Sequence, residues 1–345
     1  MLAAIDFAVI PEKAIDPGNL KIIDYRNTSG PYYLFHESDG KKQLNANTRH
    51  WNINNKTPVS IEMYSTPTSA SNELDPIDLL LKNTIDHVST ITELTCEQLA
   101  EAEKALGSEV SFHKTAPIKL FYILFTNTGR TLPKQERIGI SKAISSTLKE
   151  YFEHNPDCRQ LTNEYYPPQS DGYLDAIQKT AAVNIRNQTP PLPPNKKYSI
   201  GAPPSRMSLF TKMFATNPQF KIIEERRIPW NLWIENNDEP VLVVGAVDSS
   251  FREDIGNLSY ANSQGFFFRT REAGNQWLSE YMATDDKKKR LAELRRLHFN
   301  AVVEDPLLIP WASRPYVAIT RNNWKTFLPN FASNNPLWNI LIAKD

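Results

Sequence analysis

The sequence is poor in the residues on which many metal and redox sites depend. Of 345 residues, only 12 are glycine, 6 are histidine and 2 are cysteine. Cys96 and Cys158 lie far apart and form no CxxC or Cys/His group, which argues against a zinc site or a disulfide framework but leaves a single disulfide open. The histidines are scattered along the chain. We therefore predict no metal site and no cofactor.

The motifs of the common enzyme classes are also missing. The sequence contains no GxSxG, GxxxxGK[ST], HExxH or GxGxxG, so it lacks the usual loops that present a nucleophile, phosphates, zinc or a dinucleotide. Adjacent acids such as Glu304 and Asp305 point apart instead of flanking one substrate. We predict that the chain is not an enzyme.

Charge of one sign and long apolar runs are absent as well. Lys plus Arg and Asp plus Glu both number 39, so no net field attracts nucleic acid, and we expect none to bind this segment directly. No apolar run approaches the roughly 20 residues of a membrane helix. The N-terminus shows no basic region followed by a long apolar stretch, so no export signal is visible.

The sequence does contain alternating strand and helix patterns, which predict an α/β fold. Two nearly continuous apolar runs, 118–125 and 241–247, are typical of strands covered on both faces. The Pro-rich stretch 155–194 is interpreted as a rigid surface connection. Further strands are predicted at 30–35, 59–64, 196–200, 220–224, 306–311 and 316–319, and helices at 76–83, 95–106, 134–154 and 205–214 and within 274–303.

Several of these segments, in this order, resemble family 5 of the extracellular solute-binding proteins, the oligopeptide-, dipeptide- and nickel-type receptors of ABC importers. The N-terminal anchor is Thr28 to Leu34, followed by Gln43 to Asn47 and Trp51. The later matches are Thr84-Ile85-Asp86, the strand Phe121 to Asn127, the helix from Glu136-Arg137 through Ala143-Ile144, Pro229-Trp230 with Trp233, Val243 to Asp248, and Ile309-Pro310.

The resemblance implies a two-lobed fold of the class II periplasmic-binding-protein type, with mixed sheets and hinge crossings near Pro117 and Pro306. Residues 1–117 would form part of lobe I, 118–305 lobe II, and 306–345 the return to lobe I. Relative to the family pattern, the usual N-terminal part is lacking. The implied partners are a small peptide or other small solute, held between the lobes of a monomer, and an ABC permease in the membrane.

The resemblance also suggests ligand-binding residues. Asp248 matches the aspartate that pairs with a peptide's α-amino group in peptide-binding members, although it could equally cap a turn with Ser249 and Ser250. Gly245 and Ala246 stand where an aromatic residue commonly precedes that aspartate. Further candidates to line the site are Trp233, Trp311, Arg314 and Tyr316, of which Arg314 could hold a carboxylate with two hydrogen bonds.

Two other functions remain open from the sequence. A receptor would be periplasmic or attached to the cell envelope. A related group of cytoplasmic regulators fuses a DNA-binding helix-turn-helix to such a domain, so the chain could instead be the ligand-sensing domain of a transcription regulator. It could also be a truncated fragment that binds nothing.

Overall fold

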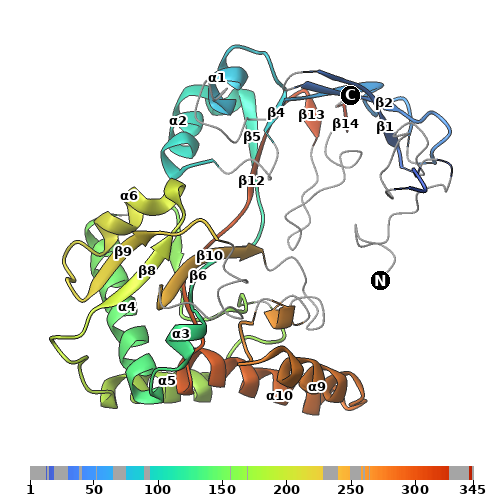
Figure 1. The fold of residues 1–345 in the computed structure, drawn as a ribbon. Helices are drawn as coiled ribbons and strands as arrows, with labels where there is room; N and C mark the ends of the chain where they lie inside the picture. The colour runs from blue at the N-terminus through green and yellow to red at the C-terminus, as the bar shows by residue number, and fades with distance from the viewer. Residues whose placement is uncertain are drawn as a thin grey trace. The chain divides into compact units, whose positions relative to one another are not determined.

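The computed structural model describes residues 13, 15–18, 30–38, 41–51, 53–64, 75–88, 94–155, 157–168, 170–227, 240–248, 258, 261–263, 265–325 and 342–343. The chain forms two compact units (Figure 1). Unit 1 comprises residues 1–114, 317–329 and 334–345, and unit 2 comprises residues 115–316 and 330–333.

The described residues of unit 1 form three small antiparallel sheets. The first joins β1 (Tyr32–Ser38), β2 (Lys41–Ala46) and β3 (Ser60–Tyr64) in that order. The second has the order β4 (His87–Val88), β12 (Val317–Arg321), β5 (Val110–Lys114), and β13 (Trp324–Lys325) pairs with β14 (Ile342–Ala343). Helices α1 (Pro76–Leu81) and α2 (Cys96–Leu106), the latter followed by the 3-10 turn η3 (Gly107–Glu109), pack with the second sheet around Leu80, Leu106 and Ile319.

The described strands of unit 2 form one mixed sheet of six. Its order is β7 (Gln160–Leu161), β11 (Leu308–Arg314), β6 (Lys119–Phe125), β10 (Leu242–Asp248), β8 (Tyr198–Ala202), β9 (Phe220–Glu224). Strand β6 is antiparallel to both of its neighbours, β10 and β11, and β8 runs parallel to β10 and β9. Strands β11, β10, β8 and β9 therefore all run in one direction, with β6 reversed among them.

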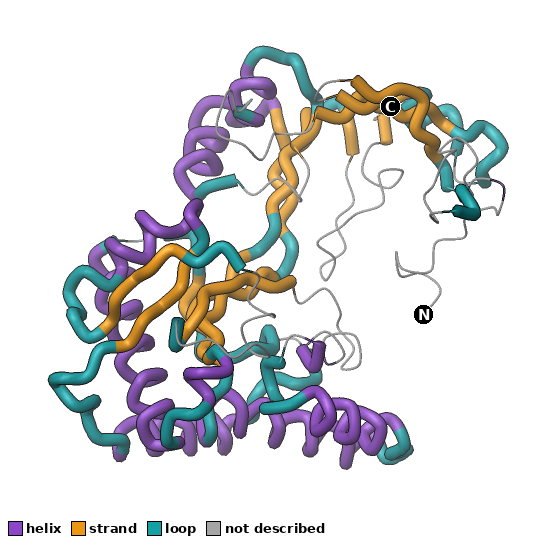
Figure 2. The backbone as a smooth tube through the Cα atoms, in the orientation of Figure 1, coloured by secondary structure: helices purple, strands orange, loops and turns teal. Residues whose placement is uncertain are grey.

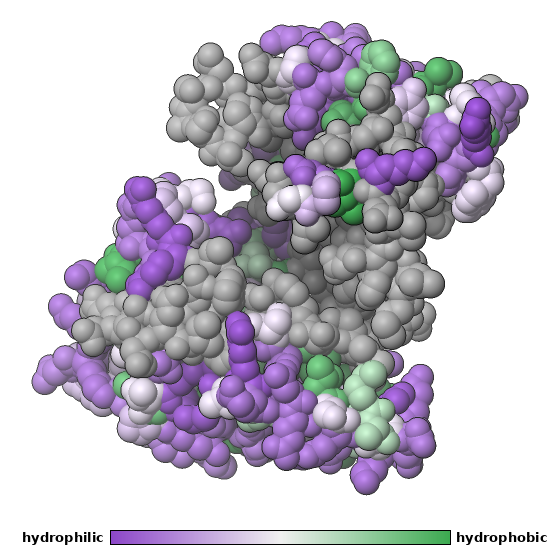
Figure 3. Space-filling model, turned by 45° about the vertical axis from the view of Figure 1, so that its right-hand side comes forward, coloured by the Kyte–Doolittle hydropathy of each residue, from purple (hydrophilic) through white to green (hydrophobic). Residues whose placement is uncertain are grey.

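Helices cover both faces of this sheet (Figure 2). One face packs on α4 (Lys134–His154) and α6 (Pro204–Met213), which bury Phe121, Ile123 and Phe125. The other face packs on α9 (Arg271–Met282) and α10 (Lys287–Phe299), which bury Leu120, Tyr122 and Leu124. The alternation along β6 explains why this strand is apolar throughout. In Figure 3, hydrophilic residues predominate on the coloured surface of the same unit.

Further helices in the described part of unit 2 are α3 (Asn127–Arg130), α5 (Ala176–Gln188) and the π-helical turn η4 (Asn300–Glu304). Helix α5 lies inside the stretch that the sequence led us to interpret as a surface connection. That interpretation was wrong for these residues. Asp175 accepts a hydrogen bond from the Gln178 N–H, and the Gln178 side chain accepts one from the Asp175 N–H. This reciprocal cap starts the helix. The apolar face of the helix is too narrow to give a helical spacing of apolar residues in the sequence.

The chain passes between the units at Lys114/Thr115 and at Tyr316/Val317, whereas the sequence led us to expect crossings near Pro117 and Pro306. The second difference arises because β11 pairs with β6 from Leu308 to Arg314, which keeps these residues in unit 2. Thr115 and Tyr316 are joined by two hydrogen bonds, of 3.0 and 2.9 Å.

A group of arginine residues lies at the end of the sheet where β6 ends. Arg130 donates hydrogen bonds to the carbonyls of Phe125, Gly265 and Phe268. Arg137, which is 1% exposed, contacts the carboxylate of Asp305, as does Arg269. Burial raises the pKa of the Asp305 carboxyl, but the two arginines lower it by more, so that the net pKa lies below its ordinary value. This edge is therefore filled by structural contacts.

Candidate ligand-binding site

The carboxyl ends of four strands lie together at the opposite end of the unit 2 sheet, which we call the carboxyl edge. Strands β11, β10, β8 and β9 all finish there, and β6 begins there with Lys119. Lys119 is directly opposite Arg314 on one side and Asp248 on the other. In open α/β sheets ligands bind outside the carboxyl ends of the strands, so this edge is the natural place to look for a site.

Two further arginines reach the same edge from outside these three strands. Arg206 is the third residue of α6, which starts directly after β8. Arg159 precedes β7, in which Gln160 is opposite Ser313 of β11. Residues spread over almost 200 positions of sequence are thus brought together by the order of the strands.

These four cations surround one aromatic ring, that of Phe121. The guanidinium carbons of Arg159, Arg206 and Arg314 lie 5.2, 5.7 and 5.8 Å from its centre. The ammonium nitrogen of Lys119 lies 5.7 Å from the same point and 5.6 Å from the centre of the Tyr316 ring. Each distance is within the range of a cation–π contact. We call Lys119, Arg159, Arg206 and Arg314 with Phe121 the basic cluster.

The basic cluster is largely withdrawn from water. Lys119 is 2% exposed and Arg314 is 8% exposed. Arg159 forms an ion pair with Asp157, and the Asp157 carboxylate also accepts the Arg159 backbone N–H at 3.0 Å. Holding several cations at low exposure costs free energy unless negative charge accompanies them. Negative charge close to these cations therefore lowers the free energy of the folded chain.

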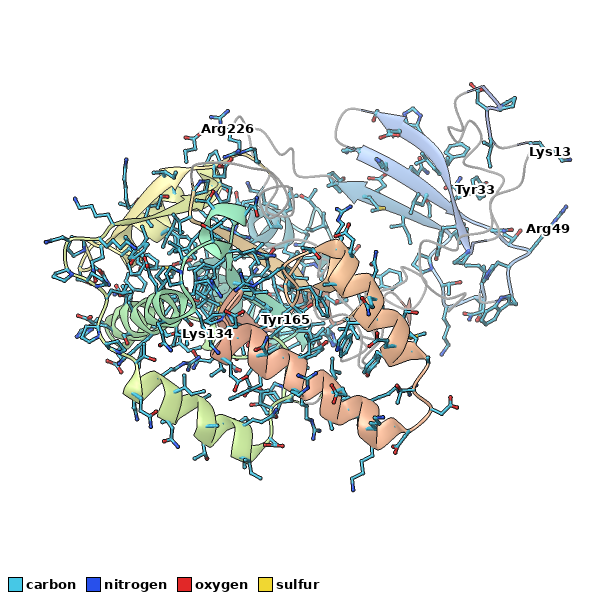
Figure 4. All side chains as sticks on the ribbon, turned by 60° about the horizontal axis from the view of Figure 1, so that its bottom comes forward. Lys13, Tyr33, Arg49, Lys134, Tyr165 and Arg226 are labelled. Atoms are coloured by element: carbon cyan, nitrogen blue, oxygen red, sulfur yellow. The ribbon has the colours of Figure 1, made fainter. Side chains whose placement is uncertain are left out.

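The arginines that follow β9 at the same edge form ion pairs with acidic residues. Figure 4 shows Arg226 beyond the end of β9, where its ion pair with Glu224 is 2.6 Å long. Arg227 pairs with Glu225 at 2.7 Å, and its hydrogen bonds hold the pKa of the Glu225 carboxyl below its ordinary value. These pairs are one-to-one, as is the Arg159–Asp157 pair of the basic cluster.

The structure places the residues predicted from the sequence in different surroundings. Arg314 and Tyr316 lie at the carboxyl edge. Asp248 ends β10 at that edge, but its side chain is outside what the structure describes, as is the whole of Trp233. Trp311 is a core residue, since its ring packs against Phe121, Phe152 and Phe210.

Sequence reasoning missed Lys119, Phe121, Arg159 and Arg206. One signal was available: Lys119 is a charged residue inside an apolar run that predicts a fully covered strand. Nothing in the local sequence pairs it with Arg159 or Arg206, because that juxtaposition depends on the strand order.

Both cysteines are in disulfides, and the chain contains no free cysteine. Their sulfurs are therefore not available as thiolate metal ligands. Cys158 lies between Asp157 and Arg159, so the bond also restrains the segment that carries one arginine of the basic cluster.

No protein-family model and no curated protein match this sequence. Solved structures do match it. The ABC transporter-associated periplasmic binding protein DppA from Helicobacter pylori, in complex with the peptide STSA, is 16% identical, with a TM-score of 0.63 over 91% of this chain and 63% of its own. The murein tripeptide binding protein MppA from Escherichia coli is 14% identical, with a TM-score of 0.61 over 92% and 64%. NikA from Brucella suis, in complex with Fe(III)-EDTA, is 11% identical, with a TM-score of 0.69 over 96% and 72%.

The chain has the fold of the periplasmic solute-binding proteins. This confirms the expected fold class, and the coverage shows that the likeness extends over nearly the whole chain. The chain spans less than two thirds of the length of DppA and MppA. Among the described residues, none of the helices is both long and apolar enough to cross a membrane.

Proposed function

We propose that this chain is a solute-binding receptor of an ABC importer that captures a small peptide-like solute and performs no chemistry on it. The observation that carries the proposal is the likeness to DppA and MppA, proteins that bind peptides. In this proposal unit 1 corresponds to lobe I and unit 2 to lobe II. The alternative of a regulator's sensing domain gains no support from these relatives.

The carboxyl edge of unit 2 supports the proposal independently. It combines the strand-end positions of Asp248, Arg314 and Tyr316 from the predicted set with the other residues of the basic cluster and with Asp157, so residues of both charges share one edge. A peptide is a zwitterion, with an ammonium that a carboxylate can hold and a carboxylate that a guanidinium can hold. We keep Asp248 as the proposed anchor of the ammonium.

A periplasmic location is part of the same proposal. Disulfides persist in oxidising compartments such as the bacterial periplasm and are rare in the cytosol. Both cysteines of this chain are disulfide-bonded, which supports export. The membrane partner in this proposal is an ABC permease.

Native mass spectrometry of the purified chain tests the proposal. We expect a co-purified or added peptide to appear as a mass adduct on the wild-type chain and to be lost from Asp248→Ala. Asp285→Ala is the matched control, since Asp285 is an exposed acid just before α10 and should leave the adduct unchanged. Failure of any peptide from a mixed library to bind the wild-type chain would refute the proposal.

A further inference from the structure

A proline-rich segment joins the end of α5 to the start of β8. It leads into the amino end of β8, whereas the carboxyl edge lies at the other end of that strand. The proposed function therefore gives this segment no role. All four of its prolines are exposed, and we call them together the proline ridge: Pro190, Pro191, Pro193 and Pro194.

The sequence favours a polyproline II backbone in this segment. A proline ring holds its own φ at about −65°, and the residue before a proline is driven away from the α region. Every residue in 189–193 is a proline, precedes one, or both. Thr189 has φ −71° and ψ 125°, close to this conformation. The helix ends in a turn, where the Lys196 N–H donates to the Pro193 carbonyl at 3.1 Å.

The burial of the side chains follows the period of such a helix. With about three residues per turn, side chains three positions apart share an edge. Leu192 packs against the core of unit 2, with its Cδ2 2.8 Å from where a Cβ on Gly139 of α4 would lie. The other two edges hold only exposed prolines, Pro190 with Pro193 and Pro191 with Pro194.

Hydrogen bonds hold both ends of the segment in place. The Lys142 ammonium donates to the Thr189 carbonyl at 2.9 Å, and the Thr189 hydroxyl donates to the Ile185 carbonyl at 2.7 Å. The Gln219 amide donates to the Pro193 carbonyl at 2.9 Å. Because the folded chain already orders this backbone, a partner that binds the proline ridge loses little further conformational entropy.

The chemistry of the proline ridge indicates the kind of partner. Polyproline II helices bind in grooves that are lined with aromatic side chains. Two basic residues follow the ridge: Lys196 pairs with Glu136, and Lys197 is exposed. An acidic residue beside the aromatic groove would complement the positive charge of Lys197.

We propose that the proline ridge is a docking surface for a partner protein whose groove is lined with aromatic side chains and has an acidic residue beside it. One edge of prolines inserts between the aromatic side chains, while Leu192 stays packed on α4. The ridge does not include any residue of the basic cluster, so this proposal is independent of the solute and of the proposed function.

A titration followed by nuclear magnetic resonance tests the proposal. The probe is an isotope-labelled SH3 domain that has an acidic residue beside its aromatic groove, and the titrant is the whole folded chain. SH3 domains bind ligands with a P-x-x-P pattern, which Pro190 with Pro193 and Pro191 with Pro194 both provide. We expect the amide signals that shift to lie in the aromatic groove of the probe.

Two variants separate the proline ridge from other exposed prolines. Pro191→Ala/Pro194→Ala removes one edge of the ridge and should weaken binding of the probe at least about tenfold. Pro168→Ala is the matched control, because Pro168 is an exposed proline in a turn of the same unit, and it should leave the affinity unchanged. Circular dichroism and thermal unfolding confirm that both variants are folded before affinities are compared.

Each other outcome overturns the proposal. Absence of shifts with the wild-type chain, or equal affinity for Pro191→Ala/Pro194→Ala, would show that the ridge does not dock in such a groove. Binding of the free peptide 188–197 without binding of the folded chain would show that the fold blocks the ridge. Self-association of the wild-type chain in light scattering, abolished by Pro191→Ala/Pro194→Ala, would assign the ridge to a second copy of this chain.

Discussion

His298 is a buried titratable residue whose role the structure defines in full. Its side chain is 0% exposed. Nδ1 donates a hydrogen bond to the Gly172 carbonyl at 3.0 Å, and Nε2 accepts the Tyr165 N–H at 2.9 Å. Tyr165, labelled in Figure 4, lies in the core beside α10. Since one nitrogen must donate and the other accept, the ring is held neutral.

This environment predicts a pH-dependent stability. Burial lowers the pKa of His298 from its ordinary 6.5 to about 4. Between these values the unfolded chain binds more protons than the folded chain, so the stabilisation is complete above about pH 6.5 and is lost as the pH falls toward 4. The loss is on the order of 3 kcal/mol. Urea unfolding at several pH values measures how the free energy of unfolding changes with pH. Across this window we expect a shallower slope of that free energy against pH for His298→Gln than for the wild-type chain.

The change in slope is the informative quantity, because His298→Gln also removes packing at every pH. His154→Gln serves as the control, since His154 is exposed at the end of α4 and its replacement should leave the profile unchanged. An unchanged slope in His298→Gln would contradict the assignment. His87 is half-buried, and burial and His113 lower its pKa to about 4. We therefore expect a residual dependence of stability on pH in His298→Gln.

Among the secondary-structure elements, β10 contains a glycine that leaves room for a side chain of the neighbouring strand β6. Gly245 is directly opposite Tyr122 of β6. A Cβ added at Gly245 would lie 2.3 Å from the Tyr122 ring, well inside contact distance. The ring itself packs edge-on against Phe266, 4.7 Å away. A glycine in this strand therefore makes room for an aromatic residue of the neighbouring strand.

Gly245→Ala should consequently destabilise unit 2 by about 1–3 kcal/mol, through overpacking. Urea unfolding at pH 7 measures this directly. The double variant Gly245→Ala/Tyr122→Val should be less destabilised than the sum of the two single variants, because the valine removes the clash. Strict additivity of the two changes would show that the ring is not the cause.

Most individual elements could be predicted from the sequence, because periodicity and end signals are local. The helix expected at 134–154 is α4 at Lys134–His154, and the strand expected at 220–224 is β9. The helix expected at 95–106 is α2, which Thr95 caps through a hydrogen bond from the Gln98 N–H. The exception, α5, depends on its Asp175 cap and buries little more than Ala182.

At the scale of the whole molecule, the order of strands was not predictable and the site depends on it. The run 118–125 indicates a covered strand but not that its neighbours are β11 and β10. Only this order sets Lys119 between Arg314 and Asp248. Family resemblance supplied Asp248 and Arg314, whereas Arg159 and Arg206 required the fold.

The central claim is that the carboxyl edge of unit 2 holds the solute. Hydrogen–deuterium exchange of the wild-type chain, with and without a saturating peptide selected from the mixed library, tests it most directly. We predict slower exchange on binding in the segments 119–121, 159–161, 205–209 and 312–316, which meet at that edge, and no change at 126–132, beside the arginine group of the opposite edge. Unchanged exchange in the first set, or protection confined to the second, would contradict the account.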